Sequence, residues 1–209
     1  MAFLSKQNLE ALTAPFGKNN PVIVQVLGIC SALAVTAKLK PAFVMALSVI
    51  AVTALSNFVI SLIRNTIPSR IRIIVQLVIV AALVILVDQI LKAFVFDVSK
   101  QLSVFVGLII TNCIIMGRLE AYAMTNKPFP SILDGLGNGV GYGIILVILG
   151  CVRELFGSGT IWGMQVIPDW VYAHGYTNNG LIILPPMALI LVGIIIWVHR
   201  SKNKSLQEK

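Results

Sequence analysis

Residues 71–92 read IRIIVQLVIVAALVILVDQILK, an apolar run whose charged residues stand near its two ends. A helix needs about 20 mostly apolar residues to cross the roughly 30 Å hydrocarbon core of a bilayer, so this run is long enough to span it. The chain of 209 residues is 57% hydrophobic and 11% charged, with a mean hydropathy of +0.92. Such a chain has too few polar residues to cover a soluble globule. The sequence therefore predicts an all-α polytopic membrane protein.

Five further apolar runs are separated by charges or turn residues. With the run above they predict six transmembrane helices, at 21–37, 41–63, 71–92, 102–119, 135–156 and 181–199. The predicted organisation is an N-terminal arm over 1–19, suited either to the membrane surface or to solution, a six-helix membrane domain over 20–199, and a polar tail over 200–209. Pro185 and Pro186 should begin or kink the last helix.

The distribution of basic residues predicts the orientation of these helices. An even number of spans puts both termini on one side, and eleven of the 16 Lys and Arg residues fall on that side. Cytoplasmic loops carry the excess of Lys and Arg, so both termini are expected in the cytoplasm. The five basic residues expected on the other side are Lys38, Lys40, Lys92, Lys100 and Arg153. Topology thus explains the net charge of +8 better than a nucleic-acid partner does.

The first three spans and the last three form halves of similar length, which predicts two inverted three-helix repeats. The leading span of each half is short, with about 17 apolar residues before Lys38 and about 16 between Gln101 and Arg118. We expect both leading helices to be short or broken. Paired interruptions of this kind indicate a site near the membrane midplane. Cys30 and Cys113 lie near the centres of these two spans.

Three cysteines in apolar segments do not form a secreted disulfide framework. Cys151 is interpreted as a small hydrophobic residue, the usual role of a lone cysteine in an apolar helix. For Cys30 and Cys113 two interpretations stay open: packing, or ligation of iron. Iron–sulfur clusters commonly take four Cys ligands, so a cluster here needs two more from a partner subunit. The matching positions of these two residues predict a shared intramembrane cluster.

Glycines at helical spacing mark the fifth span. Gly135, Gly139 and Gly143 form a small-residue stripe, which predicts close packing of two membrane helices and not a dinucleotide site. Asp88 and Asp134 are candidates for an ion pathway, because carboxylates within a membrane are costly. The structural alternative is that Asp88 reaches toward Lys92 and that Asp134 caps the glycine-rich helix. Arg153 and Glu154 are interpreted as an interfacial charge pair.

Two strings resemble a known family of membrane subunits: LGICSALAVT at 27–36 and GLIITNCIIMGR at 107–118. Further strings that carry the resemblance lie at 54–57 (ALSN), 99–107 (SKQLSVFVG), 134–139 (DGLGNG) and 153–159 (RELFGSG). Over about residues 20–198 the chain is similar to the family of D subunits of the sodium-translocating NADH:quinone reductase. The homologous E subunit of the Rnf ferredoxin:NAD reductase is the nearest alternative.

The resemblance implies a multi-pass subunit of the bacterial inner membrane, paired with a homologous E subunit of opposite orientation. Cys30 and Cys113 would ligate a [2Fe-2S] cluster together with two cysteines of that partner. The cluster would relay electrons from the cytoplasmic NADH- and flavin-bearing subunit to a covalently bound flavin, in a complex that exports sodium. No catalytic residue and no NADH or quinone site is expected on this chain alone. An inverted-repeat secondary transporter and a purely structural subunit are the competing hypotheses.

Overall fold

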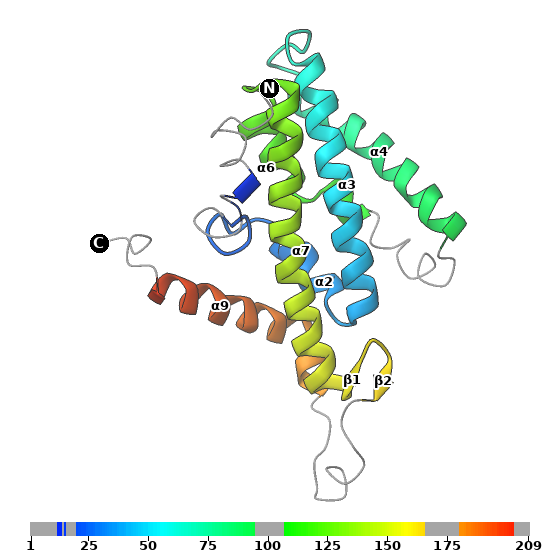
Figure 1. Cartoon of the computed structure of the whole chain (residues 1–209), viewed down its shortest axis with the longest axis vertical. Coiled ribbons are helices and arrows are strands. Elements are labelled where there is room, and N and C mark those ends of the chain that lie inside the picture. The colour runs from blue at the N-terminus through cyan, green and yellow to red at the C-terminus, as the bar shows by residue number, and fades with distance from the viewer. Residues whose placement is uncertain (1–11, 14, 16–19, 95–106, 166–179, 203–209) are drawn as a thin grey trace, which may run out of the picture.

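The computed structural model describes residues 12–13, 15, 20–94, 107–165 and 180–202, and most of this part is helical (Figure 1). Three of the described helices are long and apolar enough to cross a membrane: α3 (Leu39–Ile63), α4 (Arg72–Phe94) and α7 (Pro128–Ser158). They confirm the second, third and fifth predicted spans. The count of six spans and the inverted repeat stay predictions. Most of the expected N-terminal arm and of the polar tail lies outside the described residues.

Helices α3 and α7 form the centre of the molecule and run antiparallel along its long axis (Figure 1). A Cβ built on Gly135 would lie 2.9 Å from the Thr53 carbonyl oxygen, and one on Gly139 would lie 2.9 Å from Ile50 Cα. Because these positions lack side chains, the two backbones come into direct contact. The predicted packing role of the glycine stripe is confirmed, and the stripe packs within this chain.

The two segments that the sequence predicts as short leading spans, 21–37 and 102–119, are both interrupted in their described parts. In the first, residues 21–24 form turns and α2 (Ile29–Val35) begins after Gly28, whose φ is +78°. Val26 also has a positive φ, 57°, which is strained for a β-branched residue. In the second, a helical segment over 107–110 ends before Asn112, and α6 (Cys113–Arg118) begins there. A π-helix, η2 (Leu119–Ala123), directly continues α6.

Arg153 is buried inside the fold and does not form the expected interfacial pair with Glu154. Its guanidinium donates to the Leu33 carbonyl at 3.3 Å and to Thr36 Oγ1 at 2.5 Å, at the C-terminal end of α2. It also donates to the Ile183 carbonyl at 2.5 Å, at the end of the 3₁₀ helix η3 (Gly180–Ile183). A cation is favourable at the C-terminus of a helix, where carbonyl groups lack partners. The hydrogen bonds of Arg153 therefore connect the C-terminal ends of α2 and η3.

Glu154 interacts with a helix N-terminus, whereas Arg153 interacts with helix C-termini. Its carboxylate accepts from the Leu39 backbone N–H, the first residue of α3, at 2.5 Å. It also accepts from Thr160 Oγ1 at 3.3 Å and from the Gly163 N–H at 3.2 Å, in the hairpin of β1 (Thr160–Ile161) and β2 (Met164–Gln165). An anion is favourable at a helix N-terminus. Adjacent buried charges on α7 thus anchor different neighbours.

The last described helix, α9 (Pro185–Lys202), begins at Pro185, as expected for a proline pair at a helix start. Figure 1 shows α9 leaving the base of α7 at a large angle, while α4 diverges from α3 on the other side. Many large side chains on α4 and α9 are exposed, including Ile74 at 62% and Trp197 at 72%. These faces suit lipid or another membrane subunit.

Replacing Gly139 with Ala should destabilise the chain, because the new methyl group would press on the Ile50 backbone. We expect the free energy of unfolding to fall by about 1–3 kcal/mol, the usual cost of overpacking. Gly193→Ala on α9 is the matched control, since a Cβ there meets no atom within 4 Å. Thermal unfolding in detergent measures both. Equal stability of the two variants would contradict the close packing of α3 and α7.

Candidate functional site

The break before α2 packs directly against α6. The two interrupted segments are therefore in contact with each other. A Cβ built on Gly28 would lie 2.6 Å from Ile114 Cδ1, and one on Gly117 would lie 3.2 Å from Leu27 Cδ1. Ile114 is fully buried. Gly28 is required twice here, for its positive φ and for the space that a side chain would fill. The structure thus brings together the neighbourhoods of Cys30 and Cys113.

A hydroxyl group links the two breaks and a third helix. The buried Ser31 side chain donates to the Gly28 carbonyl at 3.0 Å. Its oxygen lies 2.5 Å from the Tyr142 hydroxyl of α7 and accepts from Asn112 Nδ2 at 3.2 Å. Serine has one hydroxyl hydrogen, which points to Gly28, so the Tyr142 hydroxyl must donate. Ser31 therefore has one donated and two accepted hydrogen bonds, its full capacity.

Asn112 is oriented by the helix that follows it. Its Oδ1 accepts from the Ile114 N–H at 3.2 Å and caps α6, as asparagine commonly does at this position. The amide nitrogen must then point away from α6, and it reaches Ser31. This bond joins two residues that are each next to a candidate ligand. Ser31 follows Cys30, and Asn112 precedes Cys113. Ser31 and Tyr142 were not predicted as site residues, because partners 111 positions apart leave no local pattern in the sequence.

The thiols of Cys30 and Cys113 are both exposed, whereas Cys151 on α7 is partly buried. Cys30 is the second residue of α2 and Cys113 the first residue of α6, so each stands where a helix begins after a break. Within the described parts of the chain, no three His, Cys, Asp or Glu side chains gather as a metal site. Two exposed thiols at matching positions amount to half of the usual ligand set of an iron–sulfur cluster.

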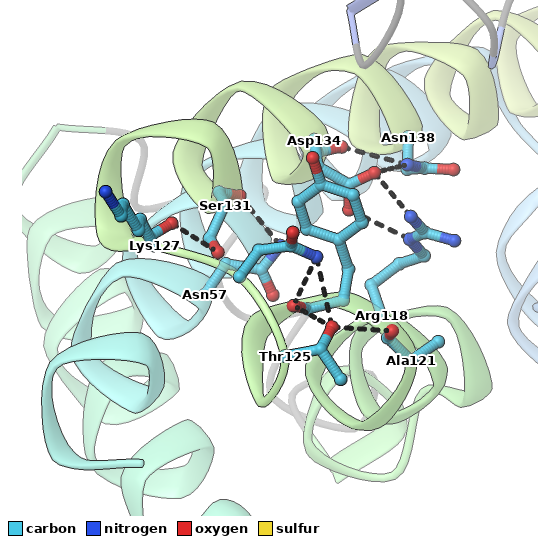
Figure 2. A network of polar contacts seen from close by, with 10 residues as sticks. Asn57, Arg118, Ala121, Thr125, Lys127, Ser131, Asp134 and Asn138 are labelled. Atoms are coloured by element: carbon cyan, nitrogen blue, oxygen red, sulfur yellow. Dashed lines mark hydrogen bonds and ion pairs between the residues drawn. The ribbon is translucent and has the colours of Figure 1, made fainter. Parts of the chain in front are cut away.

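Asp134 lies inside α7 and forms a buried ion pair with Arg118 of α6 (Figure 2). Its Oδ2 accepts from Arg118 Nε at 2.9 Å, and its Oδ1 accepts from a terminal guanidinium nitrogen and from Asn138 Nδ2 at 3.1 Å. The expected capping role is wrong, because α7 begins at Pro128, more than a turn earlier. The bidentate pair fixes the end of α6 against α7.

Two buried amide oxygens near this pair lack a hydrogen-bond partner among the described residues. They are Asn57 Oδ1 and Asn138 Oδ1. The nitrogens of both side chains are used, Asn57 Nδ2 for the Ser131 carbonyl at 3.0 Å and Asn138 Nδ2 for Asp134 (Figure 2). Asn57 therefore joins α3 to α7, as expected for an amide within a membrane bundle, whereas Asn138 bonds to Asp134 within α7.

Asp88 is placed apart from this network, on α4. It pairs with Lys92 one turn later at 2.6 Å, as the structural alternative expects, and its part in an ion pathway stays a prediction. Asp88 and Asp134 lie on different helices and have different cationic partners. In the part of the chain that the structure describes, the two candidate pathway residues thus belong to separate polar networks.

Known proteins match almost the whole chain. A family model described as "Rnf-Nqr subunit, membrane protein" matches residues 8–196, which include both breaks. The D subunit of the Na(+)-translocating NADH-quinone reductase from Shewanella sp. (strain W3-18-1) is 57% identical over 197 residues, 94% of each chain. The protein of the same name from Shewanella sp. (strain ANA-3) is 58% identical over the same shares of both chains.

Removing Arg118 should destabilise the chain strongly. Arg118→Ala leaves the Asp134 carboxylate buried and unpaired, so we expect a loss of about 3–5 kcal/mol. Lys92→Ala breaks the more exposed pair with Asp88 and should cost less than about 1 kcal/mol. Thermal unfolding in detergent compares them. In the Arg118→Ala background, Asp134→Asn should recover stability, and a further loss instead would refute the pairing as the cause.

Proposed function

The chain belongs to the Rnf-Nqr family of membrane subunits, and from this premise we propose that it serves as the D subunit of a sodium-translocating NADH:quinone reductase. In this proposal Cys30 and Cys113 hold one half of an intramembrane [2Fe-2S] cluster. A homologous E subunit supplies the other two cysteines. The observation that carries the proposal is the pair of exposed thiols at two adjoining helix breaks.

The residues around the breaks fit this role. Cluster sharing needs thiols that reach outward, and both are exposed even though the break at Gly28 packs against buried Ile114 of α6. It also needs a fixed separation between the ligands, which the bond from Asn112 to Ser31 supports. When bound, the cluster would accept and pass on single electrons. The chain's own part is to position two sulfur atoms and to supply the packed structure on one side of the cluster, while the partner would cover the other side.

Tyr142 would act as a positioning residue in this arrangement. Its phenol group is fully buried on α7 and donates to Ser31, so it fixes α2 to this central helix. Arg153 fixes the other end of α2. With both ends of a short helix held, Cys30 has little freedom to move relative to α7.

The topology proposed is six spans in two inverted halves, with both termini in the cytoplasm of a bacterial inner-membrane protein. It is supported by the distribution of eleven basic residues against five and by a break in the leading span of each half. A partner of opposite orientation would then place its own breaks beside these. Electrons would pass from the cytoplasmic NADH- and flavin-bearing subunit toward a covalently bound flavin, coupled to sodium export. Asp88 and Asp134 stay candidates for the ion pathway.

Cys30→Ala and Cys113→Ala should each abolish the cluster in the purified complex. Iron content and the reduced-state paramagnetic signal are measured, after subtraction of any cluster in the flavin-bearing subunit. Each substitution removes one of four ligands, so we expect the signal to be lost while the complex still assembles. Cys151→Ala is the matched control and should retain iron. A wild-type complex without this additional iron would overturn the relay function and favour a transporter.

Tyr142→Phe should leave the cluster in place but less firmly held. The substitution keeps the ring and removes one donor to Ser31, worth ~1 kcal/mol, so iron should be lost to a chelator about five-fold faster. Tyr122→Phe is the control, because the Tyr122 ring faces Arg118 at 5.5 Å and its hydroxyl supports neither break. Chelation is followed by absorbance. Equal rates for the two variants would remove Tyr142 from the site.

A further inference from the structure

An apolar groove of about 290 Å³ runs between α3 and α7 on their outer side. All nine lining residues are apolar side chains or glycine, among them Phe43, Leu47 and Ile50 on α3 and Gly143, Ile144 and Ile148 on α7. The groove exists because Gly143 faces the small Ala46, where a Cβ would already lie 3.2 Å from the alanine methyl group. Leu47, Ile144 and Ile148 are 53%, 43% and 46% exposed. The groove therefore opens toward the surroundings of two membrane-spanning helices.

One end of the groove carries positive charge. Lys40, Phe43, Leu47 and Ile50 follow one another at helical spacing and share a face of α3, so the lysine stands one turn beyond the groove. Lys38 lies at the same end, as the N-cap residue of α3. Both lysines are exposed, and among the described residues neither ammonium group forms an ion pair. The Glu154 carboxylate does not neutralise these lysines, because it accepts hydrogen bonds from backbone N–H groups and from Thr160.

The β1–β2 hairpin encloses the same end. The Trp162 ring packs edge-on against Phe43, with ring centroids 5.7 Å apart. Lys40 Nζ lies 3.9 Å from where a Cβ on Gly163 would stand. Trp162 adopts φ +60° and Gly163 φ +83°, a turn that Glu154 holds against the start of α3. A tryptophan beside a lysine is typical of the side chains found where a membrane meets water.

The dimensions fit one lipid chain. Residues 43–50 of α3 cover about 10 Å along the helix axis, at 1.5 Å per residue, and one leaflet of hydrocarbon is about 15 Å deep. A helix with its side chains is about 10–12 Å across and would lie over the groove instead of inside it. We propose that the groove binds one acyl chain of an anionic phospholipid, whose phosphate lies at Lys40 and Lys38 beside Trp162.

Native mass spectrometry of the purified complex tests this assignment, with phosphatidylglycerol as the added lipid and phosphatidylethanolamine as the zwitterionic comparison. Ile144→Trp fills the groove and should remove one tightly held phosphatidylglycerol. Lys40→Gln should weaken its retention about five-fold, because one lysine near an anionic surface contributes about 1 kcal/mol. Ile74→Trp on exposed α4 and Lys127→Gln at the opposite end of α7 are the matched controls and should behave as wild type.

Photo-crosslinking from a benzoylphenylalanine at Leu47 identifies the occupant independently of these variants. A phospholipid adduct supports the proposal. A crosslink to another protein chain overturns it and makes the groove a subunit contact. Equal retention of the two lipids, or equal loss in Lys40→Gln and Lys127→Gln, likewise overturns the assignment of the anionic headgroup. Cluster content in Ile144→Trp should stay unchanged, so failure here is separate from failure of the electron-relay proposal.

Discussion

The direct contact between the backbones of α3 and α7 is the constraint on which the rest of the structure depends. Burial of apolar surface gives little drive for association within lipid, so close packing of small residues must supply it. Four glycines of α7 face α3: Gly135, Gly139, Gly143 and Gly150. On another face of the same helix, Gly141 meets the Pro15 carbonyl oxygen, which a Cβ would approach to 3.1 Å. Tyr142, between these two faces, is fully buried, and its ring would lie 3.1 Å from a Cβ built on Gly28 at the first break.

Features with a local or periodic cause could be predicted from the sequence. The apolar runs, the glycine spacing and the two short leading spans each reflect a physical requirement of one segment, and the structure has α3, α4, α7 and both breaks at those places. Interactions between distant segments could not be predicted. The bonds of Ser31 with Tyr142 and of Arg118 with Asp134 depend on how helices pack, which no single window encodes. A signal for the true start of α7 was present in Pro128, a residue favoured at the first helical position.

Two of the buried charges in this fold, Arg153 and Glu154, interact with helix ends. Arg153 and Glu154 are adjacent in sequence, and their order alone suggested a pair at the membrane interface. In the structure they point to different elements, the arginine to carbonyl groups at the end of α2 and the glutamate to the N–H at the start of α3. Partial charges of opposite sign at the two kinds of helix terminus explain the division. An Arg-Glu pair in an apolar helix is thus compatible with full burial when broken helices lie nearby.

The π-helix after α6 lets this part of the chain tolerate a change of length. In η2 each hydrogen-bonded turn spans one residue more than in an α-helix, and Arg118 stands immediately before it. Deleting a single residue between 119 and 123 would convert the segment to regular α-helix with nearly the same total rotation, because the wider π-turn holds the extra residue. Arg118 would therefore still face Asp134. Deleting one residue within α6 would instead rotate Asn112 by about 100° relative to Arg118, so the contact with Ser31 or the contact with Asp134 would be lost.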